Sequence, residues 1–222
     1  MILLVNKTQR KALEYLFLQL RRDEAAQKKK IGETLKPRNT ARGRFNHTLR
    51  VLENVRMIMK EVSCDKEVVE MAAILHDIAK LSNDRQHGKK GAEIASLYLE
   101  RQGFSQKFIE KVAECIRLHS QKGETPKASI EAKILQDADL LEHHIILEIH
   151  QLIKEAAFGN LLSQHTLKQY KELYPQHFVK KCAAKGNFPI VREKFEKLIL
   201  EIDRTIIHMK EQGKEKKKES YG

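Results

Sequence analysis

Residues 47 to 139 contain histidines and aspartates of the kinds that bind metal ions. His76 and Asp77 are adjacent at the end of the apolar run AAILHDIAKL, and Asp139 lies in the similarly apolar stretch ILQDADLLEH. Burying an ionised carboxylate without a partner is costly, and metal coordination is one of the few ways to offset that cost. Neutral imidazoles and carboxylates, without thiolates, suit divalent Mn, Fe, Co, Ni or Zn, with Mg also possible. The pattern therefore predicts a centre holding one or two such cations.

Three further histidines stand where they could join the same centre. His47 lies in FNHTLRVLENV near an expected helix start, His87 precedes Gly88 in a polar turn, and His119 lies in CIRLHS at a helix end. Side chains at helix ends and in loops can converge from different helices. The candidate metal ligands are therefore His47, His76, Asp77, His87, His119 and Asp139.

The elements that must position these residues are expected to be helices. Four prolines and 10 glycines in 222 residues, and no sustained two-residue alternation, favour helices over strands. Asp65, Ser105 and Ser129 are expected N-caps, because their side-chain oxygens accept from the first free backbone N–H groups, and Pro189 suits a first helical turn. The predicted helices are Thr8–Lys30, Arg44–Val62, Asp65–Lys80, Lys89–Gln102, Ser105–Leu118, Ser129–Phe158, Thr166–Leu173 and Pro189–Gln212. The predicted fold is all-α.

Positive charge is concentrated at the N-terminal end. The formal net charge is +12, and residues 1–50 hold 13 Lys and Arg against 4 Asp and Glu, whereas residues 51–209 hold 24 against 23. A basic segment attracts phosphates, nucleic acid or an acidic surface, although it is as often a solvated face. One alternative is therefore a nucleic-acid-binding arm within residues 28–50, with Lys28, Lys29, Lys30, Arg38, Arg42 and Arg44 as its basic residues.

Composition excludes several classes of protein. An apolar share of 41% is too high for a disordered chain, and no apolar run is long enough to span a bilayer. The opening MILLV has no small-residue cleavage site of the kind that ends a secretory signal. Single, dispersed cysteines without a CxxC pair argue against a disulfide framework or a zinc ribbon; they are Cys64, Cys115 and Cys182. We expect a cytoplasmic protein with no membrane span.

The motifs resemble those of the HD-domain superfamily of metal-dependent phosphohydrolases. The resemblance runs from about Arg44 to His143 and rests on HTLRV, AAILHDIAKL, HGKKGAEIASLYL, IRLHS and ILQDADLLE in the expected order. It implies four ligands for one metal, namely His47, His76, Asp77 and Asp139. It matches His87 and His119 to the additional histidines of two-metal members.

The resemblance also decides between the two carboxylates of the DAD segment. Asp137 and Asp139 point about 200° apart on a helix, so only one of them can face the metal. The family pattern selects Asp139, and Asp137 would then be a cap, a partner of a ligand or solvent-exposed. The other histidines are expected to be structural or at the surface: His143, His144, His150, His165, His177 and His208.

The activity that the resemblance implies is hydrolysis of a phosphate ester or anhydride of a nucleotide or related small molecule by metal-activated water. Asp77 would bind metal and orient the water. Lys80, Arg50 and Arg117 would neutralise the phosphate. The alternative is a nucleic-acid-associated or nucleotide-sensing binding protein.

The expected organisation is a single helical HD-type domain with added helices at both ends. Residues 1–36 form a basic N-terminal helix or arm, residues 37–158 the metal-binding core, residues 159–212 a C-terminal helical extension packed on the core, and residues 213–222 a disordered basic tail. The apolar side of the N-terminal helix either packs on the core or serves in dimerisation or docking.

Overall fold

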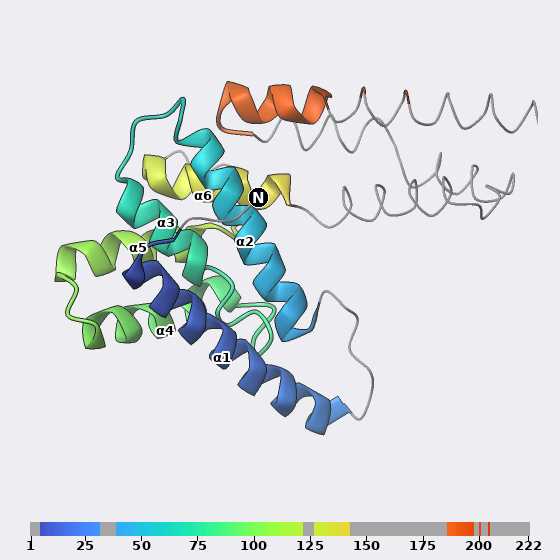
Figure 1. Cartoon of the computed structure of the whole chain (residues 1–222), viewed down its shortest axis with the longest axis vertical. Coiled ribbons are helices and arrows are strands. Elements are labelled where there is room, and N and C mark those ends of the chain that lie inside the picture. Colours follow the sequence, from blue (N-terminus) through green and yellow to red (C-terminus); the bar gives the residue numbers. More distant parts are fainter. Residues whose placement is uncertain are drawn as a thin grey trace, which may run out of the picture. The chain divides into compact units, whose positions relative to one another are not determined.

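The computed structural model describes residues 5–31, 39–121, 127–142 and 186–197, together with residues 200 and 204. Among these residues there are helices and no strand, which confirms the all-α prediction. The chain divides into two compact units, Met1–Leu141 and Glu142–Gly222. The helices of the first unit are labelled α1 to α6 (Figure 1). In the second unit residues 189–197 are helical, starting at the predicted proline.

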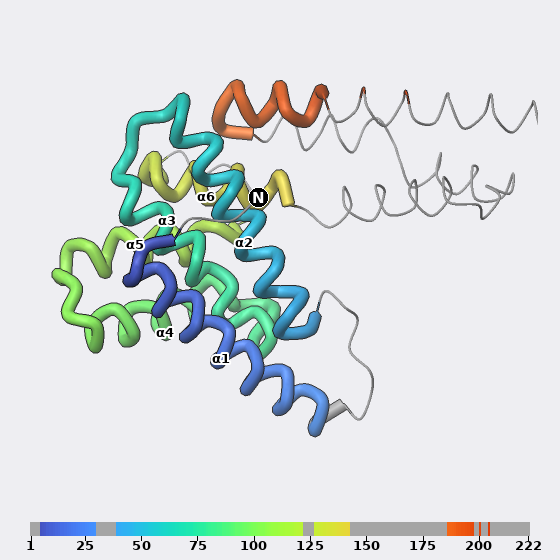
Figure 2. Tube along the Cα trace, viewed as in Figure 1, coloured from blue at the N-terminus to red at the C-terminus, as the bar shows by residue number. Residues whose placement is uncertain are grey.

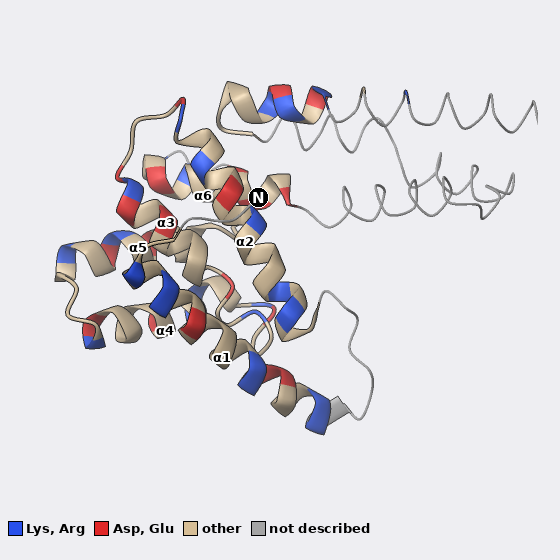
Figure 3. Ribbon diagram, in the orientation of Figure 1, with Lys and Arg blue, Asp and Glu red and all other residues tan. Residues whose placement is uncertain are grey.

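Helix α1 (Lys7–Ile31) packs on α2 and α3 through one apolar side. The buried residues on that side recur at helical spacing: Ala12, Leu13, Leu16 and Leu20. Phe17 lies edge-on against Phe45 of α2, with 5.2 Å between the ring centroids. The Lys and Arg residues of α1 from Lys7 to Lys29 are exposed, and Figure 3 marks Lys and Arg positions in blue on the ribbon. The apolar side of this helix is therefore used for packing within the first unit.

Helix α2 (Ala41–Ile58) starts three residues earlier than the predicted Arg44–Val62 and also ends earlier. The reason is Thr40, whose side chain accepts a hydrogen bond from the amide of Gly43 over 3.0 Å and so caps the helix. Eight of its residues are buried, and they recur every three or four positions: Ala41, Arg44, His47, Thr48, Val51, Leu52, Val55 and Ile58.

Helix α3 (Lys66–Leu75) is capped by Asp65, as predicted, but ends well before the predicted Lys80. Residues 76–82 form turns, in which the amides of Ile78 and Lys80 bond to carbonyls three residues back, over 3.1 and 2.9 Å. Such bonds wind the chain more tightly than an α-helix does. The ring of His76 also bonds to a helix carbonyl, which competes with the regular backbone ladder. The sequence Ile78–Leu81 contains good helix formers, so composition alone did not reveal this turn.

Helices α4 (His87–Arg101) and α5 (Gln106–Leu118) form a hairpin that can be followed along the chain trace (Figure 2). Gly103 in the connection has a φ of 79°, which glycine adopts without strain. Ser105 caps α5 as predicted, with its side chain accepting from the amide of Phe108. Because α4 starts two residues before the predicted Lys89, His87 is the first residue of a helix and not part of a polar turn.

Helix α6 (Ile130–Leu141) completes the first unit and contacts α2, α3 and α5. The side chain of Ser129 accepts from the amide of Ala132 over 3.3 Å, which agrees with its predicted capping role. No helix among the described residues is long and apolar enough to cross a membrane.

Several predictions lie outside the described residues. They are the helix Thr166–Leu173, the part of Ser129–Phe158 beyond residue 142, most of Pro189–Gln212, the tail 213–222 and the six histidines from His143 to His208. The boundaries expected at residues 36, 158 and 212 stay predictions.

Candidate metal centre

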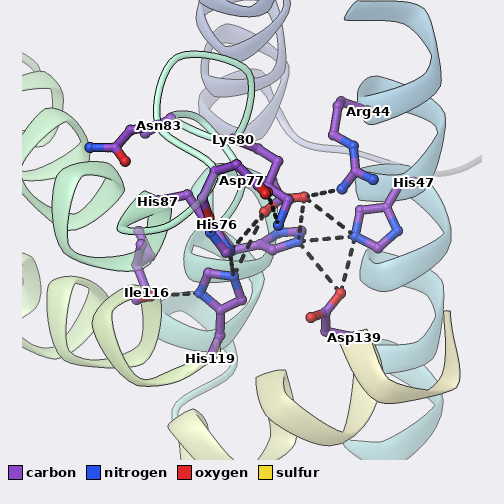
Figure 4. A network of polar contacts seen from close by, with 12 residues as sticks. Arg44, His47, His76, Asp77, Lys80, Asn83, His87, Ile116, His119 and Asp139 are labelled. Carbon is purple, nitrogen blue, oxygen red and sulfur yellow. Dashed lines mark hydrogen bonds and ion pairs between the residues drawn. The ribbon is translucent and has the colours of Figure 1, made fainter. Parts of the chain in front are cut away.

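All six predicted ligands point toward one interior region of the first unit (Figure 4). They come from the ends of several helices as well as from the middle of one. They are His47 of α2, His76 and Asp77 in the turn after α3, His87 at the start of α4, His119 just after α5, and Asp139 in the last turn of α6. Asp139 has a side chain that is 32% exposed, whereas the other five ligands are buried.

Asp77 lies between two groups of imidazoles. Its Oδ2 is 3.7 Å from Nε2 of both His47 and His76, and we call these three residues, with Asp139, the first group. Its Oδ1 is 3.6 Å from Nε2 of His87 and 3.7 Å from Nε2 of His119, and these three form the second group. Asp77 thus offers one oxygen to each group and could contribute to a cation site in both.

The spacing within the first group fits one divalent cation. Nε2 of His47 lies 3.2 Å from Nε2 of His76 and 3.1 Å from Oδ1 of Asp139. At bond lengths of about 2.1 Å, ligand atoms around a single cation lie about 3–3.5 Å apart. Within each of the trios His47–His76–Asp77 and Asp77–His87–His119, the ligand atoms all lie within 4.8 Å of one another. Both trios could therefore hold a metal ion.

Three of the imidazole rings are oriented by the backbone. Nδ1 of His76, His87 and His119 donates a hydrogen bond to the carbonyl oxygen three residues earlier, over 2.8, 2.7 and 2.6 Å respectively. A carbonyl oxygen only accepts, so Nδ1 carries the hydrogen and Nε2 presents its lone pair to the interior. A hydrogen bond from the second ring nitrogen is the usual arrangement of a metal-binding histidine.

The pair His87 and His119 gives the clearest sign that a cation belongs here. Their Nε2 atoms are only 3.2 Å apart. Nδ1 of each ring already donates to a carbonyl, so whenever both rings are neutral both Nε2 atoms are acceptors, and two acceptors at this distance repel each other. A proton or a metal ion between them removes the repulsion, so the donor set itself fits a cation.

The electrostatics favour the metal-binding form at most residues of the centre. Burial lowers the pKa of His76 to about 4, and burial also lowers the pKa of His87, so both rings are neutral near pH 7. Burial alone would raise the pKa of Asp77, but the charge of His76, a hydrogen bond from His119 and neighbouring positive charge outweigh it and hold the pKa well below its usual range. The pKa of Asp139 is lowered in the same way, because its hydrogen bond with His47 outweighs burial. At His119 burial would lower the pKa, but the hydrogen bond with Asp77 and the charges of Asp139 and Asp77 outweigh burial and raise the pKa above its usual value.

Arg44 belongs to the centre, although the sequence analysis placed it in the basic arm. Its guanidinium Nη1 lies 2.7 Å from Oδ2 of Asp77, and both side chains are only 4% exposed. The assignment of Arg44 to an exposed phosphate-binding arm is therefore wrong. Arg44 precedes His47 by three residues and lies on the same face of α2. That spacing is the sequence signal that could have indicated its role.

The three residues predicted to bind phosphate differ in position. Lys80 is 26% exposed, lies beside Asp77 in Figure 4, and pairs with the exposed Asp84 over 2.9 Å. Arg50 follows His47 by one turn and is half-buried. Arg117 is exposed, and a separation of two residues places it about 200° around α5 from His119, so it points away from the centre.

Asp137 is buried and only 1% exposed. Of the alternatives considered for it, solvent exposure is therefore wrong. Like Asp139 it lies on α6, but it points to another side of that helix.

Two glycines allow α4 to approach its neighbours closely. A Cβ atom at Gly88 would lie 2.7 Å from Oγ of Ser120 and 3.1 Å from the carbonyl oxygen of Arg117. At Gly91 it would lie 3.3 Å from the carbonyl oxygen of His76. The absence of side chains at these positions brings His87 within reach of His119.

The helical fold and the cluster of histidines and aspartates in its interior place the protein in the class of α-helical proteins with a candidate metal centre. Residues 44–143 match the sequence model of the HD domain. The match spans all six ligands and confirms the resemblance drawn from the motifs. Residues 44–143 of the chain therefore form an HD domain.

Two solved structures are similar to the chain. An HD-superfamily hydrolase from Bacillus thuringiensis matches with a TM-score of 0.59 and 18% identity over 93% of this chain and 98% of its own, which supports the fold. A predicted HD superfamily hydrolase from an uncultured Thermotogales bacterium matches with a TM-score of 0.47 and 28% identity over 78% of this chain and 92% of its own. Among curated proteins, none matches.

Proposed function

We propose that this protein is a metal-dependent phosphohydrolase that acts on a phosphate ester or anhydride of a nucleotide or related small molecule. The observation that carries the proposal is the contact between His87 and His119, whose Nε2 atoms lie 3.2 Å apart with both Nδ1 atoms already donating. The first group would hold one divalent cation and the second group another. Bound there, such cations supply activated water at neutral pH and neutralise charge on phosphoryl oxygens.

Asp77 is the central residue of this proposal. Because each of its oxygens faces one group, it fixes the distance between the two groups and orients water on their shared side. The salt bridge from Arg44 to Oδ2 offsets part of the negative charge of this buried carboxylate. Removing the carboxylate would disrupt both groups at once.

Lys80 is the residue best placed to bind the phosphate of a substrate. Its partner Asp84 is 79% exposed, and an ion pair with one exposed member contributes little to stability. Exchange of that carboxylate for a substrate phosphate therefore costs little. Arg50, one turn after His47, is the second candidate, whereas the exposed Arg117 would reach a substrate only outside the centre.

The test combines metal analysis with phosphate release. We expect about two divalent cations per chain, and turnover on a panel of nucleotides and on bis(p-nitrophenyl) phosphate with Mn²⁺, Co²⁺ or Ni²⁺. His76→Ala and Asp77→Asn should lose bound metal and turnover while far-UV circular dichroism stays close to wild type. Gln106→Met, at an exposed position on α5, is the matched control. Wild-type turnover in either ligand variant would overturn the proposal.

A substitution at Lys80 tests whether this residue contacts the phosphate of a substrate. Lys80→Met should lower kcat/KM by about tenfold or more, mostly through KM, if the ammonium contacts a phosphate in the bound substrate. Lys90→Met is the control, because Lys90 forms a similar exposed pair with Glu93 over 3.0 Å.

A comparison of monoester and diester substrates tests the type of reaction. Release of phosphate from monoesters but not from diesters would identify a phosphomonoesterase, and the reverse would identify a phosphodiesterase.

A further inference from the structure

Two half-buried side-chain amides reach from one helix to the peptide that precedes a metal ligand on another. We infer that Asn54 and Gln136 are positioning residues, one for each group of the centre. The inference rests on the proposed function, because it assigns them a role in holding metal ligands. Each of these bonds ends on a backbone carbonyl oxygen, so each side chain would act through the backbone.

Asn54 serves the first group. It lies on α2 seven residues after His47, which is two turns along the same face. Its Nδ2 donates a hydrogen bond to the carbonyl oxygen of Ala138 over 3.2 Å. That carbonyl and the amide of Asp139 belong to one planar peptide, so fixing the carbonyl also fixes the backbone from which the Asp139 side chain projects.

Gln136 serves the second group in the same manner. It lies on α6, and its Nε2 donates to the carbonyl oxygen of Leu118 over 2.9 Å. Leu118 is the last residue of α5 and directly precedes His119. Carbonyls at the end of a helix lack partners within the helix, so an added donor there restrains the last peptide. This peptide leads into the ring that lies 3.2 Å from His87.

The two contacts connect α6 to two of its neighbouring helices near the centre. Asn54 joins α2 to α6, and Gln136 joins α6 to α5. Restraint of the backbone should matter most for Asp139, because its side chain is the most exposed of the six candidate ligands, at 32%. Metal affinity depends strongly on the groups that orient the ligands, and their loss typically weakens binding by about 10–100-fold.

The experiment measures Mn²⁺ affinity in two backgrounds that each keep one group. In His119→Ala the first group remains, and in His47→Ala the second. Adding Asn54→Leu should weaken Mn²⁺ binding by about tenfold in the His119→Ala background and by less than about threefold in the other. Adding Gln136→Met should do the reverse. Each replacement keeps the approximate volume of the side chain and removes the amide, with both its donor and its acceptor.

The controls separate a positioning role from a general effect on stability. Gln106→Met removes an exposed amide bond within α5, over 2.9 Å to Glu110, and should leave both affinities unchanged. Asn54→Asp and Gln136→Glu are second variants that keep the shape but lose the donor; weaker Mn²⁺ binding despite the added negative charge would support the inference. Urea unfolding in EDTA shows whether each variant is folded.

The outcomes distinguish this inference from the function on which it rests. If the wild-type protein binds no Mn²⁺ and releases no phosphate, the proposed function fails. If it binds Mn²⁺ but Asn54→Leu and Gln136→Met weaken both groups equally, or neither, only the positioning role is overturned. The crossed pattern, with each variant affecting its own group, would support both.

Discussion

The salt bridge between Arg44 and Asp77 allows a quantitative prediction about stability. The two charges are 2.7 Å apart, and both side chains are 4% exposed. At an effective dielectric constant of about 20, their attraction is about 6 kcal/mol, and desolvation of both groups offsets part of it. Removing one member of a buried pair typically costs about 3–5 kcal/mol, because the other charge stays buried without its partner.

We expect Arg44→Leu to lower the free energy of unfolding by about 3 kcal/mol in EDTA, at the lower end of that range, because histidines still surround Asp77. For a chain of this size the melting temperature should fall by about 6–12 °C. With saturating Mn²⁺ the loss should shrink by about 1.4 kcal/mol or more, since a cation restores positive charge beside the carboxylate. By linkage, the variant should then bind Mn²⁺ about tenfold more tightly.

The matched control is Arg56→Leu, on the same helix. Arg56 pairs with Glu70 at 2.5 Å, but the two side chains are 26% and 16% exposed. A pair in contact with water is worth about 1 kcal/mol or less, and this one lies away from the centre, so Mn²⁺ should not change its cost. The assay is urea or thermal unfolding followed by circular dichroism, with and without metal. An equal loss in both variants, or a loss in Arg44→Leu that Mn²⁺ leaves unchanged, would refute the reasoning.

Three further predictions concern single positions. Gly88→Ala should weaken Mn²⁺ binding in the His47→Ala background, because its Cβ would lie 2.7 Å from a side-chain oxygen and push α4 from α5; wild-type affinity would contradict this. Burial raises the pKa of Cys115 to about 12, so iodoacetamide at pH 8 should label it about 1,000-fold more slowly than a free thiol, and mass spectrometry should find Cys64 modified before Cys115. Glu24→Gln should destabilise α2 by about 0.5–1 kcal/mol, because the carboxylate accepts from the first amide of that helix over 2.9 Å; urea unfolding that matches wild type would argue against it.

The cluster of candidate ligands could be predicted from the sequence because their residue types are unusual in apolar surroundings. His76 and Asp77 follow a run of Ala, Ile and Leu, and apolar packing alone does not account for an imidazole and a carboxylate buried side by side. The helices were predictable for a related reason, since caps such as Asp65 and Ser105 are local features.

The other features of the centre depend on tertiary contacts, which cannot be inferred from a local sequence pattern. Arg44 looks like one more cation in a basic segment until α2 packs against the turn after α3, which brings it to Asp77. The turn itself is composed of helix-forming residues and is set by bonds that reach only three residues back. The amides of Asn54 and Gln136 could not be distinguished from solvent-facing residues before the positions of α5 and α6 were known.

The bonds that orient His76, His87 and His119 have a consequence for how the centre is loaded. Nδ1 of each ring bonds to a carbonyl of its own chain segment, three residues earlier. The ring orientation is therefore formed together with the local turn, and its conformational entropy is lost during folding and not during metal binding. We therefore expect a preorganised centre, in which the rings keep their orientation without a metal and an added ion would find its ligands already oriented.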